Sequence, residues 1–475
     1  MNIFSRRYLF LFLFLLLPLA ADAQGTNHST ALDTYVHAAD DHYTYTVVDS
    51  APRQGFTVFF LRMTSQQWRT SAEVDQPVWK HWMLLYVPDH VSSSIGMLYI
   101  KGGGTTDDRP QPDEAMASIA VLTHTVVTQL FDVPNEPLTF ARDAHGPREE
   151  DEIIAYTWRK FLDTGDDGWP LRLPMTKAVV RAMDTVTSFA AGKEGGGYRV
   201  DRFFVLGQSK RGWTTWTTAA VDQRVIAIAP MVIDTLNVMP SFKHHYRSYG
   251  FWAPNVGNYY EEHLMDELDN PAFKKLMDLE DPYSYRARYT MPKLIINSSG
   301  DQFFLPDSSQ FYFNDLPGEK HLLYEANAEH SLRGTDVNES IAAFYQSLLN
   351  GTKRPEMNWT FERDGSIRVT MDSNPLKVAL WQATNRKHRD FRVEAIGRAY
   401  QAKELEPVSP GVYVARVPKP AKGWTAFFVE ATFPGGGKYQ LKFTTPVRVL
   451  PDVEPFSLPD KGKSKLQTEA EAANY

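Results

Sequence analysis

A serine in this chain lies between two glycines where an apolar strand is expected to give way to a helix. The segment reads Phe203-Phe204-Val205-Leu206-Gly207-Gln208-Ser209-Lys210-Arg211-Gly212-Trp213. A sharp strand-to-helix turn lifts a serine hydroxyl clear of the backbone, and it needs small neighbours because the strand and the helix approach closely. The usual pattern is G-x-S-x-G, whereas here Arg211 occupies the second glycine position and Gly212 follows it. The segment predicts a nucleophilic serine within a sheet whose strands alternate with helices.

Two further side chains follow predicted strands downstream of this serine. Residues 292–297 indicate a short buried strand that ends before Asp301, and residues 320–325 indicate another that ends before His330. A serine hydroxyl is a poor nucleophile unless a base accepts its proton, and a histidine oriented by a carboxylate is such a base. The order serine, acid, histidine is that of α/β-hydrolases. We therefore expect Ser209 as nucleophile, His330 as general base and then general acid, and Asp301 as the group that orients His330.

Simpler interpretations of these residues stay open. Asp301 is also typical of a turn, and His330 of a surface position before a helix. Asp307 lies six residues beyond Asp301 and is the competing acid. Because Asp307 follows Pro306, we interpret it as a helix N-cap and assign the acid role to Asp301.

A triple glycine follows an earlier buried strand. The strand is expected at residues 95–101, and the run Gly102-Gly103-Gly104 comes next. Negative charge that develops on a substrate oxygen needs backbone N–H donors, one after the nucleophile and one from the loop after the third strand. We expect these donors to be Lys210 and either Gly103 or Gly104. The ammonium of Lys210 either faces the same oxygen or is solvated in the first turn of the helix.

Four segments, two of which contain the motifs described above, carry a resemblance to a known family. They are Gly207–Trp213, Asn297–Ser308, Leu380–Ala383 and Arg389–Arg392. In these segments, and from about Ala31 to Leu450, the chain resembles the PhoPQ-activated pathogenicity-related protein family. The resemblance implies a secreted α/β-hydrolase-like protein, named for regulation by a two-component system, and implies little about its substrate. The serine segment alone is also similar to the G-x-S-R-x-G of glucuronoyl esterases, with Lys210 in place of the arginine.

The composition is that of a globular protein. The 475 residues are 43% hydrophobic and 13% aromatic, which allows one large core or two modest ones and excludes a disordered chain. The formal net charge of −7 and the lack of a basic run give no sign of a nucleic-acid partner. The absence of cysteine excludes disulfides, thiol nucleophiles and cysteine-bound metals. The adjacent His244 and His245 would point in different directions, so neither a metal nor a cofactor is expected.

The N-terminus predicts export. Arg6 and Arg7 precede an apolar run from Tyr8 to Leu19, and Ala21-Asp22-Ala23 offers a cleavage site. The run is shorter than the roughly 20 residues of a membrane-spanning helix. We therefore interpret residues 1–23 as a cleaved signal peptide that leads to the periplasm or the extracellular space, with an uncleaved anchor as the alternative. No stable membrane span is expected after cleavage, because no second apolar run follows.

The remaining chain divides into a predicted α/β-hydrolase domain at 24–350 and a β-rich region at 354–450. Strands that alternate with helices predict a doubly wound, mostly parallel sheet with its ligand site at the carboxyl ends of the strands. An aromatic-rich insertion at about 233–290 predicts a cap, whose aromatic side chains either line a pocket or form the cap's own core. The acidic run 149–152 is interpreted as a solvated helix face. Short alternating segments predict a β-sandwich at 354–450, and residues 451–475 are expected to be disordered.

Together these patterns predict a secreted serine hydrolase that acts by acyl transfer on a small-molecule ester or peptide, without a cofactor. The acyl group, the leaving group and the oligomeric state do not follow from the sequence. The alternative is a non-catalytic binding protein that uses the β-rich region and keeps the hydrolase fold as a scaffold, because a fold does not fix a function.

Overall fold

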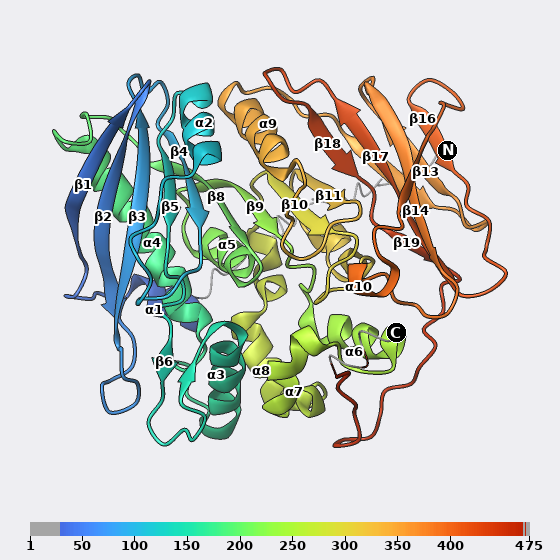
Figure 1. Ribbon diagram of the computed structural model, residues 1–475, viewed down its shortest axis with the longest axis horizontal. Helices are drawn as coiled ribbons and strands as arrows, with labels where there is room; N and C mark the ends of the chain where they lie inside the picture. The colour runs from blue at the N-terminus through green and yellow to red at the C-terminus, as the bar shows by residue number, and fades with distance from the viewer. Residues whose placement is uncertain (1–28, 469–470, 472–475) are drawn as a thin grey trace, which may run out of the picture.

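The computed structural model describes residues 29–468 and Glu471, so the predicted signal peptide lies outside the described residues. A 14-stranded mixed sheet runs through the molecule (Figure 1). Its strand order is β1-β2-β3-β5-β4-β8-β9-β10-β11-β18-β17-β14-β15, and β19 pairs with β17.

The centre of this sheet is parallel. Its six strands are β5 (Val127–Leu130), β4 (Ile95–Ile100), β8 (Arg202–Gln208), β9 (Val225–Met231), β10 (Lys293–Ser298) and β11 (Lys320–Glu325). These strands are short and almost continuously apolar because helices cover both of their faces. An antiparallel meander of β1 (Thr44–Arg53), β2 (Phe56–Gln67) and β3 (Val78–Pro88) joins this centre at β5.

Helices pack on both faces of the sheet and bury a separate apolar cluster on each. One face carries α1 (Ala31–His37), α4 (Arg172–Ala191) and α5 (Lys210–Val221), and the other carries α2 (Glu114–Thr123) and α9 (Val337–Leu349). This arrangement confirms the predicted α/β-hydrolase fold class. Within residues 29–468 no helix combines the length and the hydropathy needed to cross a membrane.

A set of short helices follows β9 and contains the predicted cap. These are α6 (Val238–Tyr249), α7 (Gly257–Glu261) and α8 (Pro271–Glu280), with 3-10 turns η1 (Pro254–Val256), η2 (Leu264–Glu267) and η3 (Pro282–Arg288). Figure 1 shows α6, α7 and α8 at one edge of the sheet together with α3 (Glu150–Thr164). The small hairpin of β6 (Leu138–Thr139) and β7 (Pro147–Arg148) leads into α3. The turns η4 (Ser308–Phe311) and η5 (Phe313–Asp315) lie between β10 and β11.

The C-terminal strands form two sheets. One holds β14 (Lys377–Asn385), β15 (Gln401–Glu404), β17 (Trp424–Phe433), β18 (Leu441–Thr444) and β19 (Arg448–Leu450), and the other holds β12 (Met357–Phe361), β13 (Ile367–Met371) and β16 (Val412–Ala415). Buried residues of both sheets, such as Val369 and Phe427, belong to one apolar cluster. The first sheet is not separate from the hydrolase sheet, because β18 pairs antiparallel with β11 and places Thr444 opposite Leu322. The one-turn helix α10 (Val393–Ile396) lies between β14 and β15.

The segment after β19 corrects the prediction of a disordered tail. The backbone N–H of Trp252 donates to Lys465 O at 2.7 Å, and the N–H of Gln467 donates to Trp252 O at 2.9 Å. Upstream, the N–H of Phe456 donates to Arg247 O at 3.0 Å. The charged and small residues of this segment suggested disorder. Composition could not show that residues of the segment bond to the cap, about two hundred residues earlier in the chain.

Removing the C-terminal segment should therefore destabilise the protein. A chain that ends at Leu450 loses these three backbone hydrogen bonds, each worth about 0.5–1.5 kcal/mol net, so its free energy of unfolding should fall by about 2–4 kcal/mol. Urea denaturation measures the change. Lys463→Ala is the control, because Lys463 is exposed and its ammonium pairs only with Asp460 among the described residues. Equal stability of the full-length and shortened chains would contradict the ordered packing.

Candidate active site

Ser209 occupies a strained turn between β8 and α5. Its φ of 58° and ψ of −128° are rare for a residue with a side chain, and such strain is typical of a nucleophile elbow. A Cβ atom added to Gly207 would lie 2.4 Å from Arg211 O, and one added to Gly212 would lie 2.9 Å from Met231 O. The glycine at 212 thus allows the close approach of helix and sheet, one residue later than in the usual motif.

His330 and Asp301 are brought together by two neighbouring parallel strands. Asp301 follows β10 and His330 follows β11, whose last residues lie opposite each other. The Nδ1 atom of His330 lies 3.0 and 2.9 Å from the two carboxylate oxygens of Asp301. Asp301 is buried, and its Oδ1 also accepts the backbone N–H of Phe303 at 2.8 Å. The side-chain amide of Gln302 accepts the N–H of His330 at 2.9 Å, so both ends of the pair are fixed.

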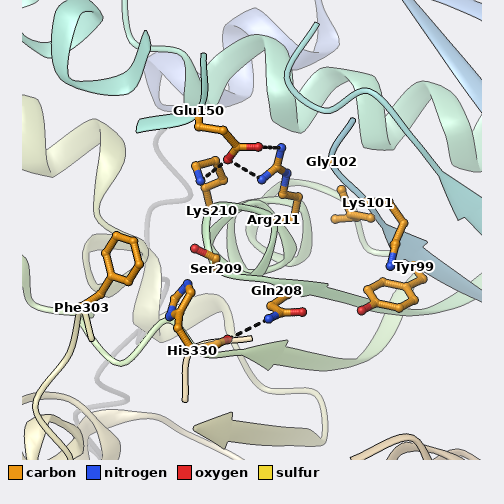
Figure 2. A pocket seen from close by; sticks show the side chains of 11 residues that line it. Tyr99, Lys101, Gly102, Glu150, Gln208, Ser209, Lys210, Arg211, Phe303 and His330 are labelled. Atoms are coloured by element: carbon orange, nitrogen blue, oxygen red, sulfur yellow. Dashed lines mark hydrogen bonds and ion pairs between the residues drawn. The ribbon is translucent and has the colours of Figure 1, made fainter. Parts of the chain in front are cut away.

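Ser209 and His330 face the same pocket, of about 280 Å³ (Figure 2). In Figure 2 a ring nitrogen of His330 points toward the Ser209 side chain. The ring of Phe303 packs against His330 with centroids 4.3 Å apart, and the Gln208 amide donates to His330 O at 2.8 Å. The pocket is lined by Tyr99, Ile100, Lys101, Gly102, Glu150, Gln208, Ser209, Lys210, Arg211, Phe303 and His330.

The structure places a different glycine of the run beside the pocket from the two predicted as oxyanion donors. Gly102 lines the pocket, whereas Gly103 and Gly104 do not. The N–H of Gly104 donates to the Asp107 carboxylate at 2.8 Å and is therefore already bonded. The strand β4 ends at Ile100, one residue earlier than predicted, so the first glycine of the run reaches the pocket. Lys210, the other predicted donor, is the first residue of α5 and also lines the pocket.

A charge cluster of Lys210, Arg211 and the half-exposed Glu150 lies beside the serine, as Figure 2 shows. Glu150 forms ion pairs with the Lys210 ammonium and with Arg211, whose Nη1 atom lies 2.8 Å away. The Lys210 ammonium also lies 3.3 Å from Asp151, and Arg211 lies 3.3 Å from Glu136. Glu150 and Asp151 of the acidic run therefore form ion pairs, whereas Glu149 is exposed as expected of a solvated face, and the Lys210 ammonium is neither solvated nor free to face an oxyanion. Sequence reasoning missed Glu150, because only the fold places the start of α3 against α5.

The two carboxyl groups of this cluster titrate in opposite directions. Burial raises the pKa of Glu136, and the negative charge of Glu150 raises it further. Burial also opposes ionisation of Glu150, but Arg211 and Lys210 outweigh it and hold the pKa of that carboxyl well below its usual range. The negative charge of this pair is thus concentrated on Glu150, between the two cations.

The family model described as "PhoPQ-activated pathogenicity-related protein" matches residues 32–392. This chain belongs to that family. It is 40% identical over 459 residues to the Dictyostelium discoideum protein called autocrine proliferation repressor protein A, covering 90% of this chain and 92% of that protein.

Solved structures of low sequence identity are also similar to this family member. An acetyl xylan esterase from Paenibacillus sp. R4 is 15% identical with a TM-score of 0.48, and the match covers 67% of this chain and 92% of that one. A glucuronoyl esterase from Solibacter usitatus is 15% identical with a TM-score of 0.39, and the match covers 67% and 88%.

Asp307, the competing acid, lies in a different network. Its Oδ2 atom accepts from Arg389 Nη2 at 2.5 Å, and its Oδ1 atom lies 3.0 Å from His244 Nε2. The other ring nitrogen of His244 lies 2.6 Å from the Glu454 carboxylate. Asp307 is the N-cap residue of η4, as predicted, but its side chain makes no capping hydrogen bond and takes part in this network instead. The partners come from the cap, the β-rich region and the C-terminal segment, none of which is visible in the local sequence.

Most aromatic side chains of the cap form the cap's own core. This was one of the two interpretations of the insertion, the other being that they line a pocket. Tyr246, Tyr249, Phe251 and Trp252 are buried, and Trp252 packs against Tyr246 with ring centroids 5.1 Å apart. Tyr259 differs from them, because it lines a second cavity beside Ser209.

The Asp307 network should make stability fall as pH rises through neutrality. Burial opposes protonation of His244, but the Asp307 and Glu454 carboxylates outweigh it and raise the pKa of His244. A raised histidine pKa contributes stability that is fully present below the unfolded value of about 6.5 and is lost as pH rises through the folded value. Each pH unit in that window should cost on the order of 1 kcal/mol.

Urea denaturation between pH 5 and 9 measures this slope, and His244→Gln is the variant that should flatten it. His42→Gln is the control, because His42 is more exposed and pairs only with Asp40 among the described residues. An equally steep slope in the His244 variant would assign the pH dependence to other groups.

Proposed function

We propose that this chain is an exported serine hydrolase in which Ser209, His330 and Asp301 act as nucleophile, base and orienting acid. The observation that carries the proposal is that a serine in a strained elbow and His330, which is paired with the buried Asp301, line one pocket. These are the parts that nucleophilic catalysis by serine requires. The backbone N–H groups of Lys210 and Gly102 are proposed as the oxyanion donors.

The proposed reaction proceeds by acyl transfer. The Ser209 hydroxyl attacks the substrate carbonyl carbon while His330 accepts its proton, and Asp301 stabilises the imidazolium that forms. The backbone N–H donors stabilise the oxyanion, and His330 then protonates the leaving group as the bond to the carbonyl carbon breaks. Water hydrolyses the acyl-serine by the same steps in reverse order. No step requires a cofactor.

The ion pairs of Glu150 hold the side chains of the two residues that follow Ser209, Lys210 and Arg211. Glu150 holds the Lys210 side chain away from the serine, so that Lys210 would contribute its backbone N–H and not its ammonium. Arg211, the residue in the second glycine position of the motif, donates from Nε to Val133 O at 2.5 Å. It therefore connects the elbow to the loop that follows β5.

Export and catalysis are separate parts of the proposal and need separate tests. The test of catalysis also decides between a hydrolase and a non-catalytic binding protein. The Dictyostelium relative is named for repression of proliferation, which describes an effect and not a reaction. The export proposal rests on residues 1–23 and is checked by the N-terminal sequence of the secreted protein. The catalytic proposal is checked by labelling of the serine.

Ser209 should be the only residue that reacts with a serine-directed probe. A fluorophosphonate with a methyl group on phosphorus and a reporter on its alkoxy arm should label the wild type, and Ser209→Ala should abolish labelling. Hydrolysis of p-nitrophenyl acetate should fall on the order of 10⁶-fold in kcat, as in other triads. Ser241→Ala is the control, because Ser241 is also buried and does not line the pocket. An unlabelled wild type would favour the binding-protein alternative.

Substitution of Asp301 should affect catalysis, whereas substitution of Asp307 should affect stability. Asp301→Asn should lower kcat about 10⁴-fold, because it presents the wrong histidine tautomer. Asp307→Asn breaks a buried ion pair with Arg389 and should lower the free energy of unfolding by about 3 kcal/mol, with little loss of kcat in the folded fraction. Stopped assays with both variants, combined with urea denaturation, measure the two effects. The reversed pattern would transfer the acid role to Asp307.

A further inference from the structure

Two cavities meet at Ser209. The larger, of about 280 Å³, is the pocket of Figure 2, and the smaller, of about 20 Å³, lies toward the cap. Ser209, Lys210 and Phe303 line both cavities. The walls of the smaller cavity are mostly apolar and come from Trp213, Ile233, Phe242, Val256, Tyr259 and Phe304.

The position of His330 decides which part of a substrate enters each cavity. His330 lines the larger cavity and does not line the smaller one. In acyl transfer the histidine must deliver its proton to the leaving group, so the leaving group has to occupy the cavity that contains the histidine. The acyl group then extends in the other direction, past Lys210 and into the smaller cavity.

The size of the smaller cavity limits the acyl group. By the same measure the larger cavity has about 280 Å³ and the smaller one about 20 Å³, so the smaller cavity suits a short acyl group. The one carboxylate in its lining, Asp151, is already paired with the Lys210 ammonium and the Tyr259 hydroxyl. An aminoacyl ammonium would therefore find no unpaired carboxylate there.

The walls of this cavity are held in place by their own contacts. The indole Nε1 of Trp213 donates to Glu280 O at 2.6 Å, and the Tyr259 hydroxyl donates to Asp151 at 3.0 Å. Phe242 packs against the Tyr259 ring, with centroids 6.1 Å apart. Because Trp213, Phe242 and Tyr259 are all buried, enlarging the cavity would require repacking of the cap.

We propose that the substrate is an acetyl ester, with the acetyl methyl group in the smaller cavity and the alcohol in the larger one. The inference rests on the proposed serine hydrolase function and chooses the ester over the peptide. Ser209 Oγ bonds to the acetyl carbonyl carbon, the ester C–O bond breaks, and the alcohol leaves with the proton from His330. Water then releases acetate from acetyl-Ser209. Phe242 and Val256 set the limit on acyl length.

The test is the dependence of rate on acyl length. Values of kcat/KM for p-nitrophenyl acetate, butyrate and octanoate are measured, and the background rate of Ser209→Ala is subtracted. Because butyrate adds two methylene groups to the part of the substrate that enters the smaller cavity, wild type should prefer acetate by about 100-fold or more. Phe242→Ala should narrow the acetate-to-butyrate ratio by about 10-fold or more by opening the wall. Phe251→Ala is the matched control, because Phe251 is buried to the same 6% exposure in the cap and does not line the cavity.

The outcomes separate this inference from the function on which it rests. Acetate preference that Phe242→Ala relaxes and Phe251→Ala retains supports the acetyl ester. If Ser209 is labelled by the methyl fluorophosphonate but butyrate or octanoate reacts as fast as acetate, the acetyl inference is overturned and the hydrolase stands. Failure of labelling together with failure of all three esters overturns both. Should Phe242→Ala not fold, Val256→Ala removes less of the same wall and is expected to relax the ratio in the same direction.

Discussion

Helix α5 lies so close to β8 and β9 that no side chain fits between them at Gly207 or Gly212. This close approach forces the chain at Ser209 into a conformation with positive φ and directs the residue into the pocket. The second glycine is displaced by one position, so residue 211 can carry a long side chain. Arg211 uses this freedom and places its guanidinium beneath the loop after β4, where a Cβ atom at Gly102 would lie 2.4 Å from Arg211 Nη2. The Arg211 guanidinium, held by its ion pairs, thus fills the space that a side chain at position 102 of the adjoining loop would need.

The buried cations next to the serine need a negative partner. This requirement holds the first turn of α3 against the start of α5. Arg211 is buried and Lys210 nearly so, and an unpaired charge at such a position is strongly unfavourable. The first residue of α3, Glu150, pairs with both, and its own backbone has a positive φ of 52° that brings the carboxylate inward. Charge balance therefore links the elbow, the glycine loop and the first turn of α3 into one unit.

The sequence predicted the contacts between residues that follow neighbouring parallel strands. It did not predict the contacts between segments that lie far apart in the chain. Ser209, Asp301 and His330 each follow a parallel strand, and the carboxyl ends of such strands share one edge, so order along the chain predicts proximity. The roles of Gly104 and Asp307 could not be predicted in the same way. The first depends on a strand that ends one residue early, and the second on Arg389 and His244, which lie far away along the chain. The pairing of β18 with β11 is likewise invisible to local patterns.

The loop after β10 is held at both of its ends, which gives the β-rich region and the C-terminal segment a part in the geometry of the site. Asp301 begins the loop and bonds to His330, while Asp307 ends it and bonds to Arg389 and His244. Glu454, from the C-terminal segment, closes the network by pairing with His244. The two aspartates are only six residues apart, so one short, partly buried loop carries both the partner of His330 and the ion pair with Arg389. The region that resembles a separate sandwich in sequence is therefore coupled to the site by an ion pair as well as by a shared sheet.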